Sequence, residues 1–104
     1  METRIVDNPK ATRFEIFMNG EVAGLVAYTR DGDTLSLLHT EIDPRFEGRG
    51  LGSILVRGVL DAVRADGALV LPFCPFIRRY LQRHTEYVDL VPAEQRAKFE
   101  LTDG

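Results

Sequence analysis

The first half of the chain alternates apolar and polar side chains in short runs, the pattern of strands that bury one face. Residues 13–18 alternate in this way, and Asn19-Gly20 follows them as a strong signal for a type I′ hairpin turn. Residues 21–29 then predict the returning strand. After a second turn at 31–33, residues 34–42 have the composition of the next strand. The pattern therefore predicts an antiparallel meander.

The second half of the chain changes to a helical period. Residues 51–66 gather their few polar side chains within about 80° of a helical wheel, so this helix is expected to be largely buried. Gly67 is suited to end it, because glycine accepts the left-handed conformation of a C-terminal cap. Residues 68–73 form a continuous apolar run of strand length. A proline then opens a second helix over 75–83, and Pro92 begins a short last helix.

A strand, a helix and a second strand in succession form a βαβ unit, in which the two strands lie parallel. Residues 34–42 and 68–73 are therefore expected to be parallel neighbours. A further strand around Ile5 and Val6 is only weakly indicated. The predicted fold class is α+β: a meander that continues through one βαβ unit into a mixed sheet with flanking helices. A length of 104 residues suits one domain, spanning 1–104.

The connection between the third strand and the first helix is rich in glycine. The first N–H groups of a helix have no partner within it, and the helix dipole places partial positive charge there. A strand, a glycine turn and a helix N-terminus together form a cradle suited to a phosphate or pyrophosphate. The alternative is a tight connection in which the glycines only permit positive φ angles. The segment reads Glu47-Gly48-Arg49-Gly50-Leu51-Gly52-Ser53.

Charge is distributed unevenly along a chain whose formal net charge is −3. Residues 45–83 carry seven arginines and three acidic side chains, whereas residues 1–44 carry four basic and eight acidic ones. A basic segment around the glycine turn would raise the local concentration of an anionic ligand. Arg49, inside the turn, is the strongest candidate for a contact, and most of the other arginines of the segment are more typical of solvated helix faces.

Composition excludes several classes of protein. A single cysteine leaves no intrachain disulfide, and two isolated histidines leave no zinc-ligand spacing, so no metal is expected. No apolar run reaches the roughly 18 residues of a membrane span, and the polar N-terminus does not resemble a signal peptide. We expect a cytoplasmic protein without a membrane partner. A pI of about 5.3 argues against nucleic acid as a partner, because phosphate backbones require a broad basic face.

Four short motifs occur in order along the chain: His39-Thr40-Glu41, Glu47-Gly48-Arg49-Gly50, Cys74-Pro75-Phe76, and Tyr80 with His84 and Tyr87. In these motifs the chain resembles the small, single-domain branch of the GCN5-related N-acetyltransferases. The glycine turn also resembles the pyrophosphate motif of the wider superfamily, Gln/Arg-x-x-Gly-x-Gly/Ala, except that Glu47 stands at its first position. The resemblance implies a minimal N-acetyltransferase fold that binds acetyl-CoA and transfers the acetyl group to an amine.

The resemblance also implies how CoA is held. The backbone amides of 48–53 would cradle the pyrophosphate, and the edge of 39–42, splayed from 68–73, would pair with the amides of pantetheine. Arg49 would contact a phosphate, and Arg78 or Arg79 would do so more weakly. The residues expected at CoA are His39, Thr40, Glu41, Ile42, Gly48, Arg49, Gly50, Leu51, Gly52, Ser53, Cys74 and Arg79.

Cys74 is the first of two candidate catalytic residues. It precedes Pro75, so it takes the N-cap position of the second helix, where the helix dipole favours a thiolate. It also leaves the strand that borders the expected cleft. Cys74 could therefore act as a nucleophile or as a general acid, or it could be a small packed side chain.

His39 is the second candidate catalytic residue. Strand alternation places it on the same face as Leu35 and Leu37, with Glu41 beside it as an orienting partner. It could act as a base, or it could be a half-buried packing residue. Among the other motif side chains, Tyr80 and Tyr87 are more typical of packing than of acid catalysis. His84 suits a helix C-terminus, where its cation would favour the dipole.

The acceptor side is expected to be open. Full-length relatives carry two helices between their first two strands and two further strands at the C-terminus, whereas 14–28 is a bare hairpin here and little follows residue 91. The acceptor could be a small amine, a protein lysine or a group supplied by a second subunit. One alternative function is a CoA-binding module with little or no turnover. Another is a nucleotide-binding protein without acyl chemistry, but the Lys-Ser/Thr ending of a P-loop is missing.

Overall fold

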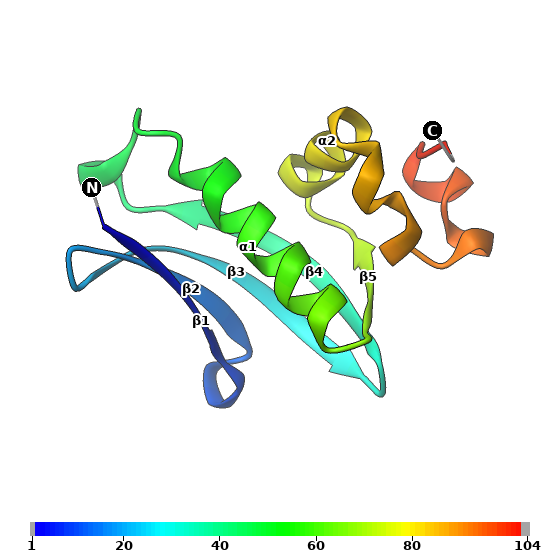
Figure 1. Cartoon of the computed structure of the whole chain (residues 1–104), viewed down its shortest axis with the longest axis horizontal. Coiled ribbons are helices and arrows are strands. Elements are labelled where there is room, and N and C mark those ends of the chain that lie inside the picture. Colours follow the sequence, from blue (N-terminus) through cyan, green and yellow to red (C-terminus); the bar gives the residue numbers. More distant parts are fainter. Residues whose placement is uncertain (1, 103–104) are drawn as a thin grey trace.

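The computed structural model describes residues 2–102, which fold around a five-stranded sheet (Figure 1). The strands lie in sequence order, antiparallel from β1 to β4, and β5 is parallel to β4. This mixed sheet confirms the α+β class and the predicted parallel neighbours. The strands are β1 (Thr3–Asn8), β2 (Arg13–Met18), β3 (Glu21–Asp31), β4 (Thr34–Ile42) and β5 (Leu69–Pro72). The α-helices are α1 (Leu51–Ala65) and α2 (Pro75–Arg83).

Turns and helix ends adopt the conformations that the local sequence predicts. Asn19 and Gly20 have φ angles of 50° and 87°, both left-handed, as a type I′ turn requires. Gly67 follows α1 with a φ of 69°, in agreement with its expected cap. The weakly indicated first strand is present as β1 and pairs with β2 along its length. The last predicted helix is a short 3₁₀ helix, Ala93–Gln95, preceded by Pro92.

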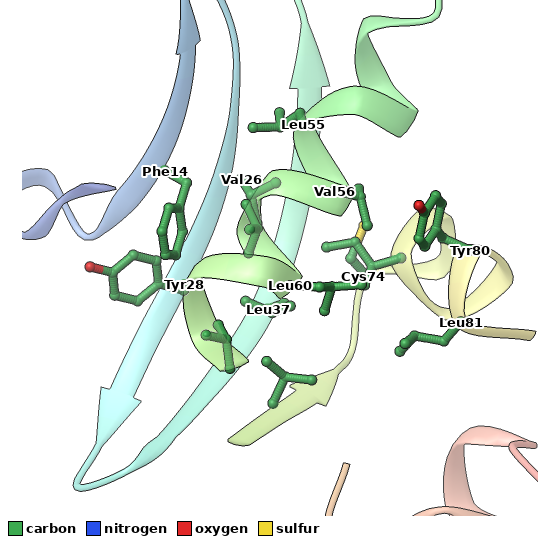
Figure 2. Packing of buried hydrophobic residues seen from close by; sticks show 14 of the residues in the cluster. Phe14, Val26, Tyr28, Leu37, Leu55, Val56, Leu60, Cys74, Tyr80 and Leu81 are labelled. Atoms are coloured by element: carbon green, nitrogen blue, oxygen red, sulfur yellow. The ribbon is translucent and has the colours of Figure 1, made fainter. Parts of the chain in front are cut away.

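Helix α1 lies across one face of the sheet (Figure 1). Figure 2 shows side chains of this helix packed against Val26 and Leu37 of the sheet. Gly58 lies against Ile5 of β1, where an added Cβ would collide with the Ile5 side chain, so the helix approaches the strand closely. The buried apolar residues of α1 are Leu51, Leu55, Val56, Val59, Leu60 and Val63.

Strand β4 contains one β-bulge. Tyr28 of β3 pairs with Leu37, but the preceding residue, Ala27, pairs with His39, so Leu38 is an additional residue in β4. Residues directly opposite each other share a face of the sheet, so His39 lies on the face of Ala27 and not on that of Leu37. The His39 side chain is 62% exposed. The prediction that His39 shares a half-buried face with Leu37 is therefore wrong, because a bulge reverses the alternation beyond it.

Candidate functional site

The glycine turn at the end of β4 leads directly into α1. Gly48 and Gly50 have φ angles of 80° and 74°, and Gly50 is the N-cap of the helix without any side-chain cap in the described chain. The first helical hydrogen bond is donated by the Ile54 N–H to the Gly50 carbonyl at 3.3 Å, so the N–H groups before it have no partner within the helix. A Cβ added at Gly48 or Gly50 would meet no atom within 4 Å. Backbone conformation, and not packing against the chain, requires glycine there.

A hollow of about 260 Å³ lies beside this turn. Ile42, Phe46 and Phe76 supply its apolar walls, and residues of the turn supply the rest. Phe76 comes from α2 and covers Gly52, where an added Cβ would lie 2.9 Å from the ring. The hollow therefore joins the end of β4, the start of α1 and the start of α2. Its open wall at Gly48 and Gly50, where no side chain projects, fits a phosphate that approaches the backbone closely.

Strands β4 and β5 separate before either reaches this hollow. Their parallel register ends at Leu37 and Pro72, and the Cys74 N–H donates one further bond to the Leu37 carbonyl at 2.9 Å. Beyond that point, residues 39–42 pair with β3 but not with β5. Some of their backbone N–H and C=O groups therefore face a gap between the strands. This is the splayed edge that the family resemblance implies.

Cys74 lies at the junction of β5 and α2 (Figure 2). It occupies the predicted N-cap position of α2 but makes no side-chain capping hydrogen bond. The residue is 4% exposed, and its sulfur lies 3.4 Å from the hydroxyl oxygen of Thr40. Thr40 is expected from the family resemblance only as a CoA contact, and its pairing with Cys74 is not predictable from the sequence, since it depends on the bulge in β4.

His39 and Glu41 lie on the other face of β4. Their side chains approach each other, with His39 Nε2 3.4 Å from Glu41 Oε2, and both are largely exposed. The predicted orienting pair is therefore present as a contact. The structure brings Thr40 to Cys74 and places His39 on the opposite side of the strand. Cys74 therefore lies on the buried side of this strand segment, next to Thr40, and His39 lies on its exposed side.

Arg49 and its neighbour Arg45 differ in their partners. Arg49 lies over the Phe46 ring at 5.7 Å and places Nη1 3.7 Å from the Met18 sulfur, without a carboxylate partner in the described residues. Arg45 forms ion pairs with Asp43 and Glu21. The Arg45 backbone N–H and guanidinium hold the pKa of Asp43 below its ordinary value. Arg49 is therefore the arginine of this turn that remains available to an anion.

The two consecutive arginines in the middle of α2 have different surroundings. Arg79 lines a hollow of about 150 Å³ together with Ser53 and Phe76, next to the hollow at the glycine turn. Arg78 instead donates to the Phe73 carbonyl at 3.4 Å and lies over the Phe99 ring. The structure thus favours Arg79 over Arg78 as a ligand contact.

The remaining motif side chains link the helices. Tyr80 is 6% exposed, accepts a hydrogen bond from Arg57 Nε at 3.4 Å, and stacks on His84 with 3.9 Å between ring centroids. His84 is the C-cap of α2, as predicted, and its Nδ1 donates to the Tyr80 carbonyl at 2.9 Å. Tyr87 donates to Asp61 of α1 at 2.7 Å. That hydrogen bond, aided by burial, raises the pKa of Tyr87 to about 12, which suits a structural link better than an acid.

Within residues 2–102, no three His, Cys, Asp or Glu side chains are grouped so that they could hold a metal ion. Neither of the described α-helices has the length and apolar character needed to cross a membrane.

Comparisons with known proteins point to one family. A family model described as GCN5-related N-acetyl-transferase matches residues 13–90. Among solved structures, a GCN5-like protein from Staphylococcus aureus superimposes with a TM-score of 0.64 at 20% identity, over 86% of this chain and 87% of that chain. No curated protein matches the chain in sequence.

Two larger proteins share part of the fold. The ribosomal-protein-S18-alanine N-acetyltransferase from Escherichia coli gives a TM-score of 0.51 at 21% identity, over 67% of this chain and 42% of that chain. Ard1 from Thermoplasma volcanium gives 0.50 at 24% identity, over 62% of this chain and 44% of that chain. The matched region is less than half the length of each of these two proteins. At such identities the likeness establishes the fold alone.

Proposed function

Because the chain belongs to the GCN5-related N-acetyltransferase family, we propose that it binds acetyl-CoA and transfers the acetyl group to an amine. One observation carries this proposal: β4 separates from β5 beyond Leu37, directly beside a glycine turn with free helix N–H groups. The gap offers backbone partners to an extended, amide-containing chain, and the turn offers N–H donors to a pyrophosphate. CoA contains both groups in succession.

The residues of the turn and the strand edge divide the binding of CoA between them. The N–H groups of 48–53 receive the pyrophosphate, and Arg49 adds a charged contact from the side of Phe46. The free backbone groups of 39–42 pair with the amides of pantetheine. This arrangement directs the thioester into the gap, between Cys74 on one face of β4 and His39 on the other.

The acetyl transfer requires two proton movements, and the two faces of β4 supply a group for each. Acetyl-CoA supplies a thioester, whose carbonyl carbon bonds to the amine nitrogen while its bond to sulfur breaks. His39, oriented by Glu41, removes the proton that the amine nitrogen loses. In the proposed transfer, Cys74 returns a proton to the departing sulfur. Alternatively, the Cys74 sulfur first accepts the acetyl group, CoA leaves as a thiol that takes up the cysteine proton, and the acetyl group then passes to the amine.

Acetyl transfer is tested by incubating the protein with acetyl-CoA and a panel of small amines and lysine peptides. The expected result is free CoA and an acetylated amine, both measured by mass spectrometry. CoA binding is tested separately by thermal unfolding, where ligand at 100 times its dissociation constant should add about 2.7 kcal/mol and raise Tm by several degrees. Absence of a Tm shift with millimolar CoA would contradict the whole proposal. Binding without turnover on any amine would support a CoA-binding module instead of an enzyme.

A further inference from the structure

Three arginines line the space between α1 and α2 and, within residues 2–102, form no ion pair with a carboxylate. The Arg57 side chain donates only to the Tyr80 hydroxyl, and the side chains of Arg79 and Arg83 have neither a hydrogen bond nor an ion pair with the described chain. Four other arginines differ from these in forming ion pairs with carboxylates. The paired arginines are Arg13, Arg30, Arg45 and Arg64.

Arg57, Arg79 and Arg83 line one groove. A hollow of about 150 Å³ holds Arg79 and Arg83, and an adjoining hollow of about 240 Å³ holds Arg57. The two share Tyr80 and other lining residues. The first of them also shares Ser53 with the hollow at the glycine turn. We refer to the two hollows together as the arginine groove, which thus continues from the predicted pyrophosphate site along the surface between α1 and α2.

Without a ligand, the positive charges of Arg79 and Arg83 on α2 repel each other. Arg79 and Arg83 are four residues apart on one helix, so their guanidinium groups lie on the same face, where like charges repel. Helix α2 carries no acidic residue that could offset them. An anion in the arginine groove would remove this repulsion and receive charge-assisted hydrogen bonds from both side chains.

We propose that the arginine groove binds the 3′-phosphate of CoA through Arg79 and Arg83, so that this protein distinguishes CoA from 3′-dephospho-CoA. The inference rests on the proposed function, because it takes the pyrophosphate to lie at the glycine turn. In CoA the 3′-phosphate is separated from the pyrophosphate by a single ribose. The arginine groove begins at Ser53, which also lines the hollow at the glycine turn. With the pyrophosphate at the turn, the 3′-phosphate, one ribose away, would therefore lie beside the arginines of the groove.

Isothermal titration calorimetry with CoA and with 3′-dephospho-CoA tests the proposal. We expect the wild-type protein to bind CoA at least about tenfold more tightly than 3′-dephospho-CoA, the scale of one charge-assisted contact. In Arg79→Gln/Arg83→Gln this ratio should fall to below about threefold, while the affinity for 3′-dephospho-CoA stays nearly constant. Lys10→Gln is the matched control, since it also removes an exposed positive charge but lies in the 3₁₀ helix Pro9–Ala11, away from the arginine groove.

Each outcome separates the inference from the proposed function. Equal wild-type affinities for the two ligands would overturn the inference and leave acetyl-CoA binding intact. An equal loss of affinity for both ligands in the double variant would place the arginines at the pyrophosphate, and would also overturn it. If neither ligand binds the wild-type protein, the proposed function fails and the inference fails with it. Both arginines are exposed, so the double variant is expected to fold, which its thermal unfolding verifies.

Discussion

The Thr40 hydroxyl oxygen lies 3.4 Å from the Cys74 sulfur and so connects β4 to the N-terminus of α2 across the point where β4 and β5 separate. The bulge at Leu38 determines this pairing. It turns Thr40 to the face of Val26 and Cys74, and without it His39 would lie on that face instead. The hydroxyl can donate a hydrogen bond to a thiolate or accept one from a thiol.

Replacing Thr40 therefore tests whether the hydroxyl positions Cys74 for reaction. Thr40→Val keeps the shape but removes the hydrogen bond, and we expect acetyl transfer to slow by roughly tenfold, the scale of about 1.5 kcal/mol. Alkylation of Cys74 by iodoacetamide at a fixed pH should slow as well. Thr40→Ser restores the hydroxyl and should recover both rates. Equal rates of acetyl transfer and of alkylation in the valine and serine variants would show that Thr40 acts only in packing.

Replacing Cys74 distinguishes its chemical roles. Cys74→Ala should retain the fold and CoA affinity but lose acetyl transfer, whether the thiol is a nucleophile or an acid. Only a nucleophile would give the wild-type protein an acetyl adduct of about 42 Da, detectable by intact mass and absent from the variant. Cys74→Ser should behave like alanine in transfer, since a hydroxyl is a far weaker acid. Transfer at the wild-type rate in Cys74→Ala would leave His39 or Tyr80 as the leading catalytic candidate.

The glycine turn should bind CoA through its backbone more than through side-chain charge. Gly50→Val is expected to abolish CoA binding, because it strains a φ of 74° and fills the cradle. Gly32→Val is its control: Gly32 has a φ of 61° and equally open surroundings, but lies in a hairpin remote from the site. It should lose stability and keep CoA affinity. Arg49→Ala should weaken binding by about 1–2 kcal/mol. A larger loss for Arg49→Ala than for Gly50→Val would refute the cradle.

His39 should affect the rate of transfer and not the affinity for CoA. His39→Gln retains a polar side chain but cannot take a proton, so transfer should fall by about 10²–10⁴-fold with the CoA dissociation constant unchanged. Glu41→Gln should have a smaller effect, because Glu41 only orients the ring across 3.4 Å. Steady-state kinetics with saturating acetyl-CoA measures the rate of transfer in the His39→Gln and Glu41→Gln variants. A His39→Gln variant as active as wild type would exclude His39 as the base.

The Tyr87–Asp61 hydrogen bond should stabilise the fold in a pH-dependent way. The bond raises the pKa of Tyr87 in the folded state to about 12, above the ordinary value of 10. Its contribution is therefore complete below pH 10 and is lost as the pH rises towards 12. We expect Tyr87→Phe to lower the free energy of unfolding by about 1 kcal/mol at pH 7, and the difference from wild type to shrink above pH 10. Urea unfolding of the wild-type and Tyr87→Phe proteins at about pH 7, 9 and 11 measures this difference in the free energy of unfolding. A difference that is constant with pH would argue against the bond.

Sequence by itself determined the features that depend on a few neighbouring residues. The turn at Asn19-Gly20, the cap at Gly67 and the N-cap position of Cys74 all follow from local backbone preferences, which tertiary contacts do not alter here. The buried helix and the apolar run after it predict the parallel pair, because a βαβ connection leaves little choice of topology. The left-handed conformation of Gly48 and Gly50 was predictable for the same reason, since it is a local property of the turn.

Only the tertiary structure decided which side chains meet. The bulge at Leu38 has no local signal, because a bulge forms where the packing of both faces of β4 demands a different register. Because of this bulge, the Thr40 side chain lies next to the Cys74 sulfur, and the His39 side chain lies on the exposed face of β4. The arginine groove likewise depends on how α2 lies beside α1, so the sequence, which indicated Arg79 only as a weak phosphate contact, did not predict that Arg79 and Arg83 line one groove. Long-range packing, and not local preference, therefore fixed which side chains lie next to Cys74 and His39.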